Sequence, residues 1–98
     1  MTLEQRLARV FLAEHPSDAA QALERLSTDR RAAVLRAAPV ESARALAHMV
    51  TSAAAESLAP LSEPEAAPVL DALPLDVTIQ LLRRMPVDAA ERLARGLP

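Results

Sequence analysis

The sequence contains no cysteine and no lysine, one glycine and one aromatic residue, Phe11. The lack of cysteine excludes disulfide frameworks, thiolate metal sites and cysteine nucleophiles. With Gly96 as the single glycine, the glycine-rich loops that cradle phosphates are excluded as well. No apolar run approaches the roughly 20 residues that span a bilayer, and the charged N-terminus has no signal-peptide hydrophobic region. We therefore expect a cytoplasmic chain that does not insert into a membrane.

The length and charge of the chain bound its organisation and its partners. Its 98 residues, 51% of them apolar, suffice for one core but not for two. A net charge of −2 gives no general attraction to nucleic acid, so we expect no nucleic-acid partner. We predict one domain over residues 1–98, with a leading helix over 1–14 and repeats over 15–97.

A repeat of about twelve residues runs through the chain after residue 14. The units open at or beside Pro, Ser or Thr and close on apolar residues. One such unit cannot bury its own apolar face and needs neighbours, which is typical of repeat architectures. The unit over 51–61 is one residue short. The blocks are 15–26, 27–38, 39–50, 51–61, 62–73, 74–85 and 86–97.

The period within the units is helical, and no strand pattern alternates over a useful length. We predict an all-α fold of seven or eight short helices. The predicted buried faces are Leu75, Ile79, Leu82 and Met85; Val87, Ala90, Leu93, Ala94 and Leu97; and Leu3, Leu7, Val10 and Phe11. A charge introduced by Leu82→Asp is accordingly expected to unfold the domain.

The expected helix ends follow from prolines and capping residues. Proline is tolerated in a first helical turn and disfavours helix at the residue before it. We expect Pro68 to kink its helix or to delay the helical start to about residue 65. Unit boundaries are predicted at Pro16, Pro39, Pro74 and Pro86, and capping boxes at Thr2–Gln5 and Ser62–Glu65.

An acidic stretch in the second half of the chain is the candidate site. No cationic residue lies between Arg44 and Arg83. Mg²⁺ and Ca²⁺ prefer oxygen ligands, so carboxylates on consecutive helices could bind such an ion; an ordinary solvated acidic face is the alternative. The candidate metal ligands are Asp71, Asp76, Glu63 and Glu65, and the candidate partner-binding residues are Glu56, Arg83 and Arg84.

Catalytic chemistry has no comparable support in the sequence. His15 and His48 are not in a metal-ligand spacing, and several serines stand where helix caps are expected. We expect no enzymatic activity and no catalytic residue.

The segment over 15–39 resembles the opening of the intracellular N-terminal domain of MgtE-type magnesium transporters. The matching positions are His15, Pro16, Asp18, Ala19, Leu23, Leu26, Val34, Leu35 and Pro39, and the later segment PLDVTIQLLRRMPVDAAERL continues the pattern. The resemblance covers residues 15–97 and implies a compact, right-handed superhelix of short helices. Asp76 aligns with an acidic segment of the family, whereas Val77 and Gln80 stand where the family often has acids.

The resemblance also implies a function. In that family the domain is a cytosolic cap that docks on CBS domains, which join it to a transmembrane pore. Mg²⁺ bound between the acidic faces holds the assembly compact and the pore closed, because divalent cations neutralise carboxylates that otherwise repel each other. For this chain it implies Mg²⁺ as a weak ligand, completed by a partner domain, and a homodimer formed through the full-length protein.

Two alternative interpretations remain open from the sequence. The flagellar motor switch protein FliG has middle-domain repeats of related architecture with a Glu-His-Pro-Gln start, and here Glu14-His15-Pro16 is followed by Ser17. A helical-repeat adaptor with another partner is the other alternative. The twelve-residue Pro-x-Asp spacing favours the transporter domain over the motor protein.

Overall fold

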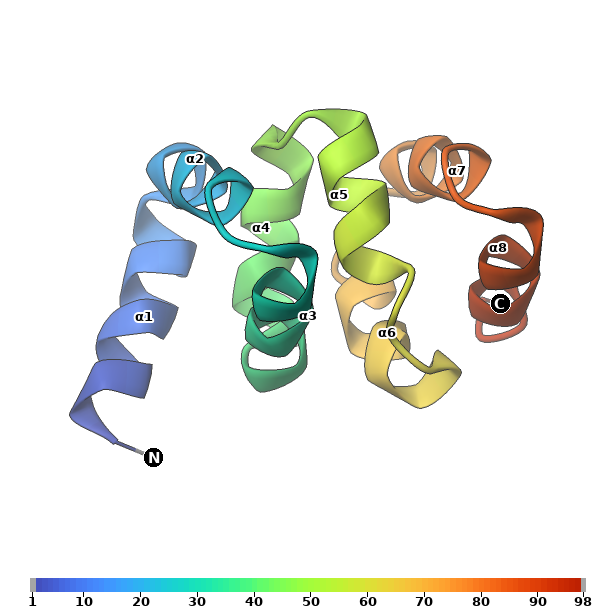
Figure 1. Ribbon diagram of the computed structural model, residues 1–98. Helices are drawn as coiled ribbons and strands as arrows, with labels where there is room; N and C mark the ends of the chain where they lie inside the picture. The colour runs from blue at the N-terminus through green and yellow to red at the C-terminus, as the bar shows by residue number, and fades with distance from the viewer. Residues whose placement is uncertain (1, 98) are drawn as a thin grey trace.

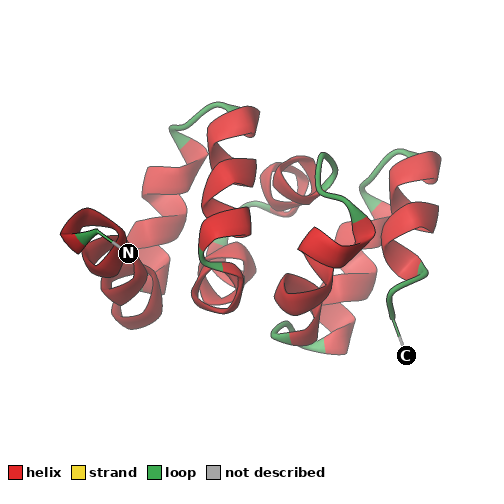
Figure 2. Cartoon of the chain, turned by 90° about the horizontal axis from the view of Figure 1, so that it is seen from below, coloured by secondary structure: helices red, strands yellow, loops and turns green. Residues whose placement is uncertain are grey.

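The computed structural model describes residues 2–97, apart from the side chains of Leu3, Glu4 and Leu7, as an array of short helices (Figures 1 and 2). This part of the chain contains no strand, and the predicted all-α class is confirmed. The helices are α1 (Leu3–Glu14), α2 (Pro16–Glu24), α3 (Thr28–Ala37), α4 (Pro39–His48), α5 (Thr51–Leu58), α6 (Glu63–Asp71), α7 (Leu75–Arg83) and α8 (Val87–Ala94).

The helices after α1 begin at nearly constant intervals, which confirms the predicted repeat length. Successive helices start 12 residues apart, except for an interval of 11 between the starts of α3 and α4. The shortened unit is therefore the one that begins with α3, two units earlier than the predicted unit over 51–61. Its cause is the connection between α3 and α4, which consists of Ala38 alone.

Proline marks four of these helix starts, as predicted. Pro16 and Pro39 are the first residues of α2 and α4. Pro74 and Pro86 are the N-caps of α7 and α8. All four lie where a backbone N–H has no partner within the helix. Proline, which lacks the N–H, therefore loses no helical hydrogen bond at these positions.

The two predicted capping boxes are both present. In the first, the Thr2 N–H donates to Gln5 Oε1 (3.0 Å) and the Gln5 N–H donates to Thr2 Oγ1 (3.1 Å). In the second, the Ser62 N–H donates to Glu65 Oε1 (2.9 Å) and the Glu65 N–H donates to Ser62 Oγ (3.3 Å). This second box fixes the start of α6 at Glu63, and the helix then continues through Pro68. The predicted delay of the helical start to residue 65 is therefore wrong.

The turns between helices need no glycine. No described residue has a positive φ angle. A typical turn ends one helix in a right-handed residue, Arg25 (φ −83°, ψ −14°), and opens the next from an extended N-cap, Ser27 (φ −64°, ψ 159°). Backbone conformations of this kind are open to any residue, which explains how the connections between the helices coexist with a single glycine.

Each helix from α2 to α6 packs on the helix two positions later in the chain (Figure 1). The pairs are α2 with α4, α3 with α5, α4 with α6, α5 with α7 and α6 with α8. The leading helix departs from this rule, because its main contacts are with α4 and α2. The regular stacking is compatible with the superhelix that the sequence predicts, whose handedness stays a prediction.

Leucine and alanine supply most of the core. Ala45, Ala54 and Ala66 have no exposed surface, and neither have Leu58 and Leu61. Alanine at these positions lets helix backbones approach closely, because the distance between packed helices depends on the side chains at the contact. Helices of eight to ten residues are marginal alone, so this packing holds them in place.

The buried face of α7 differs from the predicted one. Leu75 is 68% exposed and Ile79 is 40% exposed, whereas Thr78 and Leu81 are buried. Met85 is buried as predicted, and Leu82 is partly buried against the core. Apolar residues occupy a broad arc of this helix, so periodicity did not decide which part of the arc faces inward; packing on α5 and α8 decided it.

The same correction applies at the other end of the chain and in α8. Val10 is 50% exposed and Phe11 is 41% exposed, while the neighbouring Leu12 is buried. In α8, Val87 is 73% exposed and Leu93 is buried as predicted. Of that predicted set, Ala90 and Leu97 are partly buried and Ala94 is exposed. The predicted residues Leu3 and Leu7 lie outside the described side chains.

Four arginines bind carbonyl oxygens at the C-terminal ends of other helices. These ends carry unpaired carbonyls and a partial negative charge, so a guanidinium there stabilises the helix. Much of the cationic first half of the sequence thus has a structural function. The contacts are Arg9 Nη2 to Ala37 O (2.7 Å), Arg31 Nε to Leu23 O (2.8 Å), Arg44 Nη1 to Ala13 O (3.2 Å) and Arg92 Nη2 to Ala59 O (2.6 Å).

Candidate functional site

The residues predicted for the site lie on α5, α6, α7 and the turn that follows α7. Most of them are exposed; Glu63 and Glu65 are half-buried. Their positions distinguish them electrostatically, because a helix favours anions at its N-terminus and cations at its C-terminus. Glu63, Glu65 and Asp76 lie in first turns, Glu56 and Asp71 in last turns, Arg83 is the last residue of α7 and Arg84 is its C-cap.

Glu65 has a structural function in this fold. One carboxylate oxygen accepts the Ser62 backbone N–H, and the other lies 2.9 Å from Arg36 Nε, which joins α6 to α3. The Ser62 backbone N–H is the main cause of a lowered pKa of Glu65, assisted by the Ser62 hydroxyl and the Arg36 charge. A metal ion would have to displace these partners, so Glu65 is the least available of the four predicted ligands.

Glu63 and Asp76 also contribute to their own helices. Glu63 is the first residue of α6, and Asp76 lies in the first turn of α7. A carboxylate at either position is stabilised by the unpaired N–H groups of the helix start. Their presence is therefore explained in part by helix formation alone.

Asp71 and Glu56 have no such explanation. Each lies in the last turn of its helix, where the negative end of the helix dipole disfavours a carboxylate. Neither α5 nor α6 has a basic residue in that turn to compensate for the charge. A cation, or a cationic partner, near these two carboxylates would relieve the repulsion.

The structure does not bring the predicted ligands together into a closed metal site. Among the residues that the structure describes, no group of three or more His, Cys, Asp or Glu side chains could hold a metal ion. Mg²⁺ keeps several of its waters and needs only one or two protein carboxylates, so Asp71 or Asp76 fits a site shared with another domain.

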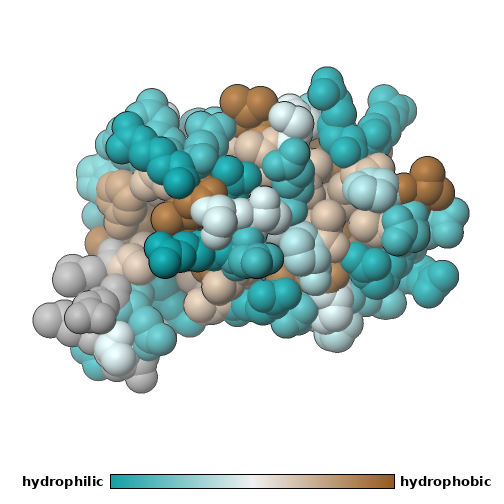
Figure 3. All heavy atoms as spheres, in the orientation of Figure 1, coloured by the Kyte–Doolittle hydropathy of each residue, from teal (hydrophilic) through white to brown (hydrophobic). Residues whose placement is uncertain are grey.

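Arg83 and Arg84 lie at the C-terminal end of α7, where cations are favoured. Both are exposed, and among the described residues the ion pair that forms is Arg36–Glu65, which involves neither of them. Helix stabilisation accounts for their position. The face seen in Figure 3 is mostly hydrophilic, with separated apolar patches.

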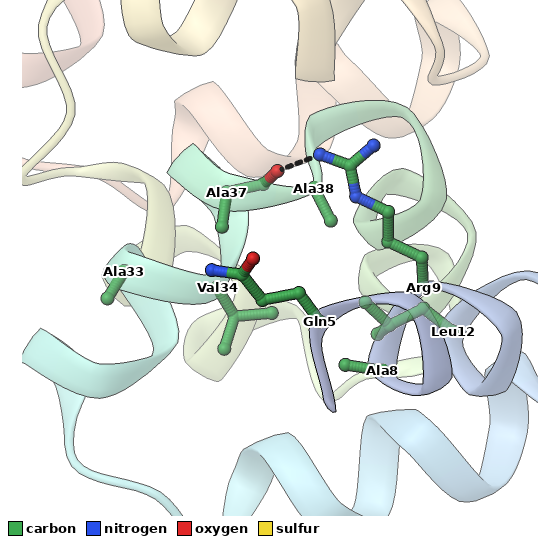
Figure 4. Close-up of a pocket in the computed structure, with 8 residues that line it drawn as sticks. All are labelled: Gln5, Ala8, Arg9, Leu12, Ala33, Val34, Ala37 and Ala38. Atoms are coloured by element: carbon green, nitrogen blue, oxygen red, sulfur yellow. Dashed lines mark hydrogen bonds between the residues drawn. The ribbon is translucent and has the colours of Figure 1, made fainter. Parts of the chain in front are cut away.

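An apolar groove along α1 was not predicted from the sequence. It has a volume of about 560 Å³ and lies between α1 and α3 (Figure 4). Arg9 reaches across it from α1 to the Ala37 carbonyl on α3. Alanine is too common in this sequence for the lining to have been recognised in advance. The lining residues are Gln5, Ala8, Arg9, Leu12, Ala33, Val34, Ala37 and Ala38.

Fold and surface together define an α-helical repeat domain with an acidic segment on consecutive helices. None of the described helices is both long enough and apolar enough to span a bilayer. The model of the family described as the MgtE intracellular N domain matches residues 14–98. The chain therefore belongs to the intracellular N-domain family of MgtE magnesium transporters, as the resemblance around His15 and Pro16 indicated. No curated protein and no solved structure matches the chain significantly.

Proposed function

We propose that this chain is a cytoplasmic regulatory domain that senses Mg²⁺ by docking, in a cation-dependent manner, on the CBS domains of a magnesium transporter. Its membership of the MgtE N-domain family supports this proposal. The observation that carries it furthest is the position of Asp71, an exposed carboxylate at the last residue of α6 with no basic residue in the same turn. Such a charge is best placed for a cation that arrives with a partner.

The proposed mechanism is electrostatic. Asp71 and Asp76 flank the turn between α6 and α7, and they would supply oxygen ligands to Mg²⁺ from this side of the interface. Without the ion, these carboxylates repel an acidic surface on the partner. With the ion, both acidic surfaces bind the same Mg²⁺, which holds them together. Glu56 and Glu63 add to the same negative field, whereas Glu65 stays with Ser62 and Arg36.

Arg83 and Arg84 complete the proposed docking surface. They follow the acidic segment at the far end of α7, and both are exposed. A partner with acidic residues beyond its own metal ligands would meet this pair. The docked domain would then transmit the Mg²⁺ signal to the transmembrane pore, in an assembly that is a dimer through its other domains.

The experiment is an amide-resolved NMR titration of this chain with MgCl₂ through the millimolar range, against NaCl of equal ionic strength. It is repeated with the CBS domains of an MgtE transporter present. We expect weak shifts around Asp71 and Asp76 in the chain alone and Mg²⁺-dependent docking in the mixture. The double variant Glu56→Gln/Asp71→Asn should lose the docking, and Asp88→Asn, an exposed acid in α8, should retain it.

The alternative function is that of a helical-repeat adaptor, including a motor-like scaffold, for which the divalent cation is irrelevant. Docking of equal strength in MgCl₂ and in NaCl would favour the adaptor and contradict the sensing proposal. Uniform shifts in the chain alone, together with no docking in the mixture, would also contradict it.

A further inference from the structure

The outward face of α1 lies at one end of the helical array, and no described helix packs on it (Figure 1). The opposite side of this helix lines the groove toward α3 and carries the buried Leu12. On the outward side, Val10 is 50% exposed, whereas Phe11, which is 41% exposed, lines a second, smaller groove toward α2 and α3. All residues of α1 except Glu14 lie outside the residues 14–98 that match the family model. The face also shares no residue with the proposed docking surface on α5, α6, α7 and the turn that follows α7.

The charges on this face are arranged symmetrically about Val10. Arg6, Val10 and Glu14 follow one another at four-residue spacing, and all three are exposed. Residues four apart lie on the same side of a helix, so each charge is about 6 Å along the axis from Val10. Neither Arg6 nor Glu14 makes a side-chain hydrogen bond or ion pair with another described residue.

This arrangement complements itself under a two-fold rotation. When two copies of α1 lie antiparallel with their Val10 side chains at the axis, Arg6 of each copy faces Glu14 of the other. A two-fold interface requires such self-complementarity, because the same surface patch serves both subunits. The apolar Val10 would lose its exposed surface at the centre, with an ion pair on either side.

We propose that α1 is a self-association helix, through which two copies of this chain form an isologous dimer. The contact rests on a helix of 12 residues, about 18 Å long, so the interface is small and the dimer is weak. It differs from a dimer held through other domains of a transporter, and it does not depend on Mg²⁺. The proposal therefore stands or falls separately from the proposed function.

Charge exchange tests the geometry by sedimentation velocity over a wide range of chain concentrations. Arg6→Glu and Glu14→Arg each replace both ion pairs of the dimer by like-charge contacts, and each should weaken self-association about tenfold or more. An equimolar mixture of the two variants should associate again, because the helix face that carries two acids in one variant then meets the face that carries two arginines in the other. The double variant in one chain should self-associate like the parent.

The variants are chosen so that unfolding cannot imitate the expected result. Arg6→Glu places an acid toward the start of α1 and Glu14→Arg places a base at its end, and both changes suit the helix dipole. Each single variant should therefore keep the parent's helix content and melting temperature. Val10→Asp should abolish the dimer, whereas Val40→Asp, at a comparably exposed valine of α4, should not. A parent chain that stays monomeric at the highest concentration, or a mixture that associates no better than the single variants, would overturn the proposal.

Discussion

The inward and the outward faces of this helical array treat apolar side chains in opposite ways. On inward faces, Ala54 and Leu58 of α5 have no exposed surface, because α3 packs on one side of the helix and α7 on the other. On outward faces, Val10 of α1, Val40 of α4 and Leu75 of α7 are at least half exposed. The local sequence is amphipathic in both places. The difference shows that burial in a repeat protein depends on the presence of a neighbour, and that exposed apolar residues mark where one is missing.

The largest expected effect separates two leucines of the same helix. Leu81→Asp should leave α7 with an unpaired charge in the core, at a cost above about 4 kcal/mol, and should abolish the cooperative unfolding transition. Leu75→Asp should change stability by less than about 0.5 kcal/mol, because its side chain is 68% exposed. Circular dichroism during thermal and urea unfolding measures both. An equal loss of stability in the two variants would contradict the observed orientation of α7.

A smaller effect is expected from adding bulk rather than charge. Ala54 has no exposed surface, so Ala54→Leu should overpack the contact between helices and cost about 1–3 kcal/mol. Ala8→Leu, in the open groove along α1, should be nearly neutral. Urea unfolding of both variants gives their free energies of unfolding relative to the parent. If Ala8→Leu proved the more damaging, the groove would have to be closed in solution.

The smallest expected effect is the pH dependence that Glu65 adds. Its pKa in the folded chain lies below the ordinary 4.5, so the unfolded chain takes up the proton more readily as the pH falls. The stabilisation is therefore complete at neutral pH and is lost as the pH falls from about 5 through the folded pKa. Glu65→Gln keeps the capping box without the charge and should flatten the acid limb of the stability curve. Unfolding followed between about pH 7 and pH 3, with Asp88→Asn as the control, tests this sign; a steeper limb would contradict it.

The sequence predicted the helices better than it predicted their orientation. Helix starts at Pro16 and Pro39 and the capping box at Ser62–Glu65 depend on caps and backbone restrictions that act over a few residues, and they were found in advance. The buried faces were less certain. Leu93 was placed correctly, but Ile79 was expected inside and lies 40% exposed.

The candidate site was predicted as a list of acids without their relative importance. The sequence could not show that Glu65 is bound to Ser62 and Arg36, because Arg36 is 29 residues away in the chain. It also could not show that the last turn of α6 ends on Asp71 with no compensating base. Once the helix bounds are known, the dipole argument separates Asp71 and Glu56 from the acids that stabilise helix starts.

By itself, the sequence determined the all-α class, the twelve-residue repeat, the capped helix starts and the family, because these depend on residue type and on spacing along the chain. Only the tertiary structure decided which arc of each helix is buried, which helix ends the arginines cap, and where the groove along α1 lies. These features depend on which helix packs against which, and a helix with a broad apolar arc is locally compatible with several neighbours. The unpartnered face of α1 became visible only when those neighbours were in place.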